Sequence, residues 1–170
     1  KESPAAKLKN YAVSDQRDRV MSEEEERQLL AAAKPGMQIA IVVAVETGIR
    51  KAAVAALSWE HIELDRRVIT MPASLAKNRK AWQVPISARL LELLRGLERS
   101  SPIVPYKNAS ISPLFHRLCK AEGVKDLRFH DLRHTCATRL RRAGVDWFTL
   151  MKTLNHQNPK HAMRYQTISG

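Results

Sequence analysis

Apolar residues along this chain recur in runs and at helical spacing, separated by helix start and stop signals. Nearly every residue from 37 to 46 is apolar, which predicts a buried central helix. Ser22 offers a helix N-cap with Glu25 three residues later, and this capping box predicts a helix over residues 23–34. After the central helix, the pattern predicts a second short helix over residues 51–59.

Two segments in the middle of the chain have the composition of strands. Residues 67–72 and 81–86 predict an antiparallel pair joined by the segment 73–80. The expected hairpin tip is polar and basic, with Lys77, Asn78, Arg79 and Lys80. A helix over residues 88–99 is expected to follow, capped by Ser87.

The second half of the chain is expected to be helical. Residues 100–110 predict a loop, and Ser112-Pro113 predicts the start of a helix that ends at Gly123. Phe129-His130-Asp131 is expected to open a helix reaching residue 143, and Asp146 to cap another that closes at residue 155. Asn158-Pro159 predicts a last short helix. The whole pattern therefore predicts a mainly α domain with one small β-hairpin.

The charge balance narrows the class of partner. The 170 residues include 29 Lys and Arg against 17 Asp and Glu, a formal net charge of +12. Such an excess favours a polyanion, with DNA or RNA as the first candidate. Selection for solubility is the alternative explanation, since it also drives net charge away from zero.

Membrane and disulfide classes fit poorly. The longest apolar stretch, residues 37–45, is too short to span a bilayer, and no basic amphipathic helix with an aromatic face is present. Cys119 and Cys136 form no Cys-x-x-Cys pair and lie in apolar segments, so we expect them to be core residues. These features predict a reducing, cytoplasmic compartment and no membrane partner.

Several polar residues stand where chemistry is possible. His130 and Arg133 are spaced to share one face at a helix start, where phosphate is attracted, although an ordinary surface helix start capped by Asp131 explains them too. Arg50 lies between apolar helices and needs a partner or an anionic ligand. A structural salt bridge to Glu46 or Glu60 is the competing explanation.

Three further candidates lie at the hairpin tip and near the end of the sequence. Lys77 could reach a phosphate or leaving oxygen, but most lysine-rich turns are merely solvated. His156 follows the predicted end of a helix, and Tyr165 lies nine residues after His156. A lone tyrosine in such a place is usually a surface or packing residue. The order and spacing of these residues carry more information than any one of them.

Other reaction classes have weaker support. His130 and His134 lack the glutamate of the zinc-protease pattern, and Arg133 between them would repel a metal, so no metal site is expected. A glycine-rich phosphate loop and a serine nucleophile elbow are also absent from the sequence.

Five segments in order resemble the tyrosine recombinase (phage integrase) family, specifically its C-terminal catalytic domain. They are Thr47-Gly48-Ile49-Arg50 with Leu57-Ser58-Trp59, Ala76-Lys77 through Val84-Pro85-Ile86, His130-Asp131-Leu132-Arg133-His134-Thr135, Leu154-Asn155-His156, and Arg164-Tyr165. The resemblance runs from about Val20 to Tyr165, nearly the whole chain. It implies the DNA breaking–rejoining fold and a DNA strand-transfer activity.

The resemblance also implies a role for each candidate residue. Tyr165 attacks a scissile phosphate and forms a 3′-phosphotyrosine, while Arg50 and Arg133 bind the non-bridging oxygens. Lys77 protonates the leaving 5′-oxygen. His130 assists proton transfer at the tyrosine, and His156 hydrogen-bonds a phosphate oxygen. The expected partner is double-stranded DNA, without metal or other cofactor, in chemistry shared with type IB topoisomerases.

Two positions depart from the family pattern. Ala53 stands where an acidic residue usually helps to hold the first arginine, which affects the expected geometry of Arg50. Asn155 stands where glycine is usual, and we expect little consequence because asparagine is the next-best residue for a left-handed helix stop. The main alternative is therefore a catalytically impaired DNA-binding module of the same fold.

The resemblance carries expectations about organisation as well. Residues 1–19 are expected to be a linker from an N-terminal DNA-clamping domain, and residues 20–170 the catalytic domain. The family assembles as a homotetramer on paired DNA sites, here on the bacterial nucleoid. Basic residues expected to contact DNA, against the alternative of a solvated face, are Arg79, Lys80, His134, Arg139, Arg141 and Arg142.

Overall fold

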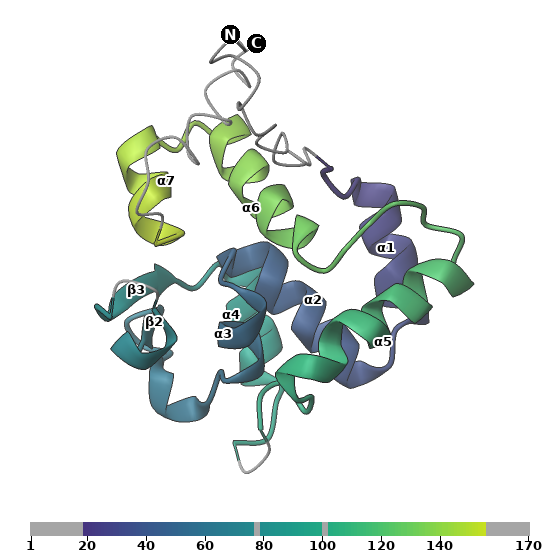
Figure 1. Ribbon diagram of the computed structural model, residues 1–170. Helices are drawn as coiled ribbons and strands as arrows, with labels where there is room; N and C mark the ends of the chain where they lie inside the picture. The colour runs from purple at the N-terminus through teal and green to yellow at the C-terminus, as the bar shows by residue number, and fades with distance from the viewer. Residues whose placement is uncertain (1–18, 77–78, 100–101, 156–170) are drawn as a thin grey trace, which may run out of the picture.

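The central helix α2 (Pro35–Thr47) organises the domain. In the computed structural model, which describes residues 19–76, 79–99 and 102–155, α2 contacts α3, α4, α5 and α6. Figure 1 shows these helices gathered around it, with the small sheet at one side. Eight of its residues are buried, as the apolar run predicts. The helix begins at Pro35, because proline needs no hydrogen-bond acceptor at a first helical position.

The remaining helices follow the predicted order with shifted ends. They are α1 (Glu23–Ala32), α3 (Lys51–Ala55), α4 (Ala88–Arg95), α5 (Asn108–Ala121), α6 (Asp131–Arg142) and α7 (Trp147–Thr153). Capping side chains account for several starts. Ser22 and Glu25 form the predicted capping box, Ser87 accepts from Leu90 N, and Asp146 accepts from Thr149 N.

Three predicted helix boundaries are wrong, including the end of α4, which lies at Arg95 rather than at residue 99. Helix α5 begins at Asn108 rather than at Ser112, so Pro113 lies inside the helix. A proline in the second turn removes only one backbone hydrogen bond, and burial of Ile111 and Phe115 stabilises the helix on both sides of it. Helix α3 ends at Ala55, and Trp59 belongs instead to a 3₁₀ turn, Trp59–His61.

The described part of the chain contains a three-stranded antiparallel sheet rather than a simple hairpin. Strands β2 (Val68–Met71) and β3 (Trp82–Pro85) confirm the predicted pair, with Ile69 opposite Val84. The missed strand is β1 (Ile62–Glu63), which pairs with β2 at the sheet edge. Two residues are too few to show the alternation by which a strand is recognised from sequence.

One main core unites these layers. Its largest fully buried side chains include Phe115, Met21, Leu29 and Ile41, and Cys119 also lies within it. Cys136 is buried too, so the prediction that both cysteines are small core residues is confirmed. No helix in the described ranges is long and apolar enough to cross a bilayer.

A buried carboxylate joins three helices at the edge of this core. Glu26 of α1 is 5% exposed and pairs with Arg89 of α4 and Arg139 of α6, each at 2.6 Å. Arg89 also contacts Glu46 of α2 at 3.2 Å, and Glu46 accepts from the Ser87 hydroxyl. The cluster therefore fixes how α1, α2, α4 and α6 pack.

We expect Glu26→Gln to lower the free energy of unfolding by about 2 kcal/mol, because hydrogen bonds to a charged partner contribute about 1.5–3 kcal/mol each. Chemical denaturation measures the loss. Glu24→Gln is the matched control on the same helix: its ion pair with Arg27 is 73% exposed on both sides, and such a pair contributes about 0–1 kcal/mol. Equal losses for the two variants would contradict a structural role for the buried cluster.

Candidate functional site

The first turn of α6 holds the predicted His-x-x-Arg pair. His130 is exposed at the N-cap position, whereas Arg133 one turn later is buried. Asp131 is 2% exposed, and its carboxylate accepts a 2.8 Å hydrogen bond from Arg128 N. Asp131 thus fixes the approach to the helix, as a first-turn acid is suited to do.

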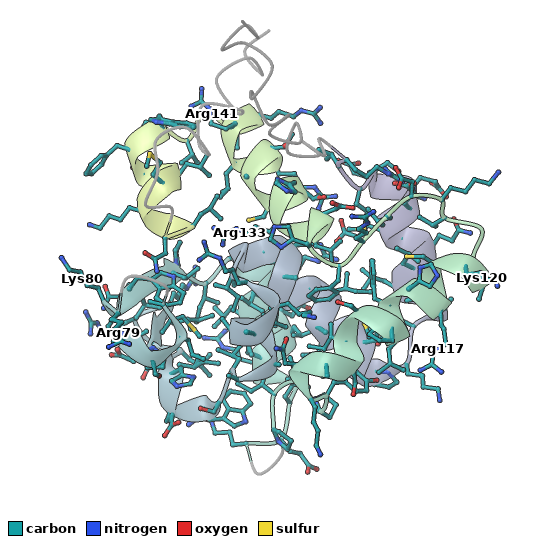
Figure 2. The ribbon with its side chains drawn as sticks, in the orientation of Figure 1. Arg79, Lys80, Arg117, Lys120, Arg133 and Arg141 are labelled. Atoms are coloured by element: carbon teal, nitrogen blue, oxygen red, sulfur yellow. The ribbon has the colours of Figure 1, made fainter. Side chains whose placement is uncertain are left out.

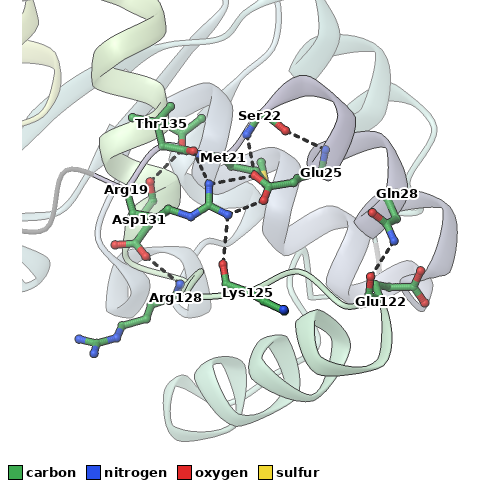
Figure 3. A network of polar contacts seen from close by, with 11 residues as sticks. Arg19, Met21, Ser22, Glu25, Gln28, Glu122, Lys125, Arg128, Asp131 and Thr135 are labelled. Atoms are coloured by element: carbon green, nitrogen blue, oxygen red, sulfur yellow. Dashed lines mark hydrogen bonds and ion pairs between the residues drawn. The ribbon is translucent and has the colours of Figure 1, made fainter.

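A polar network anchors this turn to the segment before α1 (Figure 3). The Thr135 hydroxyl donates to the carbonyl of Asp131 and accepts from Met21 N, both at 2.9 Å. Arg19 pairs with Glu25 and donates to the carbonyl of Lys125 at 3.2 Å. The hydrogen bond from Arg19 holds the pKa of Glu25 below its usual value. The α6 start is therefore held from two sides.

Arg133 is the buried centre of the site. Its side chain reaches two helix ends: Nη1 donates to the carbonyl of Gly48 and Nη2 to the carbonyl of Leu154, both at 2.6 Å. Figure 2 places Arg133 in the interior, where α6 meets α2. At 6% exposure, the charge needs such acceptors to offset its lost hydration. A single guanidinium thus connects the ends of α2 and α7 to α6.

Backbone conformation brings these two ends together. Gly48 has φ +63°, and a Cβ at this position would lie 2.4 Å from Cδ2 of Leu154. Only glycine satisfies both constraints without a shift. Asn155, after Leu154, has φ +50°, so the expected left-handed stop is confirmed. These turns end α2 just before Arg50 and end α7 just before Asn155, the last residue described.

Arg50 is partly buried at the N-cap of α3, two residues after Gly48. The structural alternative predicted for it is wrong, because Glu46 binds Ser87 and Arg89 while Glu60 contacts Ser58 and His61. Ala53 is 1% exposed in the core, so the position at which the sequence resemblance predicts an acid holds a buried apolar residue.

His130 has positive neighbours. Its pKa is lowered from the usual 6.5, first because the surrounding protein partly desolvates this exposed residue, and then because Arg133, Arg50 and, when protonated, His134 place positive charge nearby. Asp131 acts in the opposite direction. The rings of His130 and His134 meet edge to face, with centroids 5.4 Å apart. The lowered pKa favours a neutral imidazole, which is able to accept a proton.

Three predicted site residues, Lys77, His156 and Tyr165, lie outside the described residues. The structure therefore brings together Arg50, His130 and Arg133, and it describes the chain up to the residue before His156. Within those described ranges, no group of three or more His, Cys, Asp or Glu is suited to hold a metal ion.

Apart from His134, which is partly buried against the ring of His130, the residues expected to contact DNA divide into two groups. Arg79 and Lys80 are exposed beside β3, well away from the loop that precedes α6 in Figure 2, and Arg142 is exposed at the end of α6. Arg139 instead pairs with Glu26, and Arg141 donates to the carbonyl of Val145 at 2.8 Å. Structural contacts account for the positions of these last two.

The acceptors of Arg133 escaped sequence reasoning. They are backbone carbonyls of Gly48 and Leu154, which no residue type announces. The available signals are indirect: a glycine at a helix end, and an asparagine where a second helix stops. Both mark helix termini whose carbonyls lack intrahelical partners.

Comparison with known proteins assigns nearly the whole chain to one family. The model of the phage integrase family matches residues 19–169. The shufflon-specific DNA recombinase of Escherichia coli is 29% identical over 147 residues, which cover 84% of this chain and 38% of that protein. The chain spans less than half the length of the first curated relatives it matches.

Solved structures share the fold. The catalytic domain of bacteriophage HP1 integrase aligns with TM-score 0.71 and 22% identity, covering 88% of both chains. A lambda integrase dimer bound to a core site aligns with TM-score 0.69 and 22% identity, covering 89% of this chain and 48% of that one. The predicted fold class is confirmed.

We expect His130 to titrate below 6.5 in the folded protein, which NMR of ring-labelled histidine measures. The unfolded chain then binds the proton more tightly, so His130 contributes a loss of stability as pH falls below 6.5. His134→Gln removes one positive neighbour and should raise the midpoint. A midpoint at or above 6.5 in the unsubstituted chain would rule out the electrostatic account of this site.

Proposed function

Because this chain belongs to the phage integrase family, we propose that it cuts and rejoins DNA as the catalytic part of a site-specific recombinase. The observation that carries the proposal is the buried Arg133, whose hydrogen bonds to Gly48 and Leu154 draw two chain segments to the start of α6. Arg50 lies on one segment, and the other leads to His156. Such a convergence of cationic and proton-transferring groups is suited to a phosphodiester.

The proposed reaction exchanges one phosphoester for another. The Tyr165 oxygen forms a bond to the scissile phosphorus as the bond from phosphorus to the 5′-oxygen breaks. The tyrosine loses its proton with the assistance of His130, and Lys77 gives a proton to the departing oxygen. A 5′-hydroxyl attacks the phosphotyrosine to rejoin DNA, so no external energy source is needed.

Fixed positive charge is the proposed source of rate enhancement. Negative charge grows on the non-bridging oxygens as tyrosine attacks, and preorganised donors stabilise it more than they stabilise the starting phosphate. Arg50 and Arg133 supply planar guanidiniums that stay charged at any working pH, and His156 adds a hydrogen bond. This arrangement performs the charge stabilisation that metal ions provide elsewhere, so the proposed reaction requires no metal.

Double-stranded DNA is the proposed partner. The +12 charge favours a polyanion, and Arg79 and Lys80 offer exposed cations on the hairpin that carries Lys77. The whole recombinase is proposed to work as a homotetramer on paired sites of the nucleoid.

Ala53 supports a second candidate function, a DNA-binding module with impaired catalysis. A buried alanine offers Arg50 no carboxylate at this position, and Arg50 stands at the N-cap of α3. The two candidates separate on covalent chemistry, since both predict DNA binding.

We expect a covalent protein–DNA adduct when the chain is incubated in EDTA with a nicked duplex that lets the cut strand escape. Denaturing electrophoresis after a detergent quench measures it. Tyr165→Phe should abolish the adduct while leaving DNA affinity within about two-fold, because only the nucleophile is lost. Tyr106→Phe is the control, since Tyr106 packs against the core.

An adduct that survives Tyr165→Phe, or one that forms only with added metal, would contradict the proposed chemistry. Absence of any adduct on a cognate site, even after an acid is restored by Ala53→Asp, would favour the binding module.

DNA binding should weaken steeply with salt, because neutralised phosphates release counterions. For about six phosphate contacts, affinity falls roughly 10³-fold between about 50 and 200 mM salt. Fluorescence anisotropy across this range measures the slope. A nearly flat profile would contradict a contact dominated by the phosphate backbone.

A further inference from the structure

We infer that Gly48 and Leu154 are positioning residues, which hold Arg133 in its working orientation and tie it to the helix end that precedes Arg50. The inference rests on the proposed function and adds to it two buried residues. It stands on the paired hydrogen bonds of Arg133 and on the close contact between the two acceptor residues.

The geometry of the Arg133 guanidinium is the first support for this positioning role. An arginine has five N–H donors in one rigid plane. Two of them reach separate carbonyls, from Nη1 to Gly48 and from Nη2 to Leu154, both at 2.6 Å. Acceptors on both terminal nitrogens fix the plane against rotation. A lysine at this position would keep the charge but lose the fork.

The contact between the two acceptor residues, Gly48 and Leu154, is the second support. A Cβ on Gly48 would meet Cδ2 of Leu154 at 2.4 Å and Sγ of Cys136 at 3.1 Å. Leu154 is 1% exposed and packs with Ala137 and Leu150. Neither carbonyl can therefore move away from Arg133 without disturbing the other helix end.

The short separation in sequence between each acceptor residue and a candidate site residue is the third support. Gly48 precedes Arg50 by two residues, and Leu154 precedes His156 by two. A shift that separates Gly48 from Leu154 therefore alters the orientation of Arg133 and the placement of Arg50 together. Misplacement by about 1 Å can slow a positioned reaction on the order of 100-fold.

The test compares Gly48→Ala with Gly123→Ala. Both glycines have positive φ, +63° and +70°, so both substitutions strain the backbone, but a Cβ on Gly123 meets nothing within 4 Å. At saturating DNA, we expect Gly48→Ala to slow adduct formation by about 10- to 100-fold and to change DNA affinity by less than about three-fold. Gly123→Ala should keep the cleavage rate.

A second substitution tests the contact directly. Leu154→Ala removes the atom nearest to the new Cβ, so the double variant Gly48→Ala/Leu154→Ala should cleave several-fold faster than Gly48→Ala alone. A purely destabilising role predicts the opposite, because two losses of packing accumulate. If Gly48→Ala does not fold, Leu154→Ala alone should slow cleavage at saturating DNA.

Side-chain NMR of the Arg133 guanidinium distinguishes a failure of the positioning role from a failure of the proposed function. Restricted rotation in the unsubstituted chain that is lost in Gly48→Ala supports the positioning role, and it is observable without cleavage. If adducts form but Gly48→Ala behaves like Gly123→Ala, positioning is overturned while the proposed function stands. If the unsubstituted chain forms no adduct on a cognate site, the proposed function fails, and a catalytic role for the positioning contacts fails with it.

Discussion

The burial of the Arg133 charge is the constraint on which the rest of this site depends. A guanidinium that is 6% exposed requires acceptors, and the fold supplies them from the carbonyl ends of α2 and α7. Those carbonyls face the guanidinium because Gly48 and Asn155 turn the chain in the left-handed region. The helices that build the core are thereby also the elements that position the proposed catalytic groups.

The charge of Arg133 also acts on His130, which is exposed at the start of α6. His130 lies next to Arg133, Arg50 and His134, and their positive charge together with desolvation lowers its pKa. A neutral imidazole beside fixed cations suits a reaction in which a proton leaves and negative charge develops on phosphate. The buried charge of Arg133 therefore affects both folding stability and the proposed chemistry.

Local signals made much of this fold predictable. The capping box at Ser22 and Glu25, the N-cap at Asp146 and the stop at Asn155 each act within one helical turn, so sequence alone reveals them. Tertiary pairing is different. Arg139 pairs with Glu26 across more than a hundred residues, a contact that no local signal announces, and the acceptors of Arg133 are backbone atoms without a sequence signature.

The most direct test of the central claim locates the covalent bond by mass spectrometry. The sequence contains three tyrosines, Tyr11, Tyr106 and Tyr165, and cleavage after Arg164 isolates the last of them. After nuclease trimming of the trapped adduct, the account predicts a nucleotide mass on the peptide that begins with Tyr165. A modification on Tyr11 or Tyr106, or on a residue other than tyrosine, would contradict it.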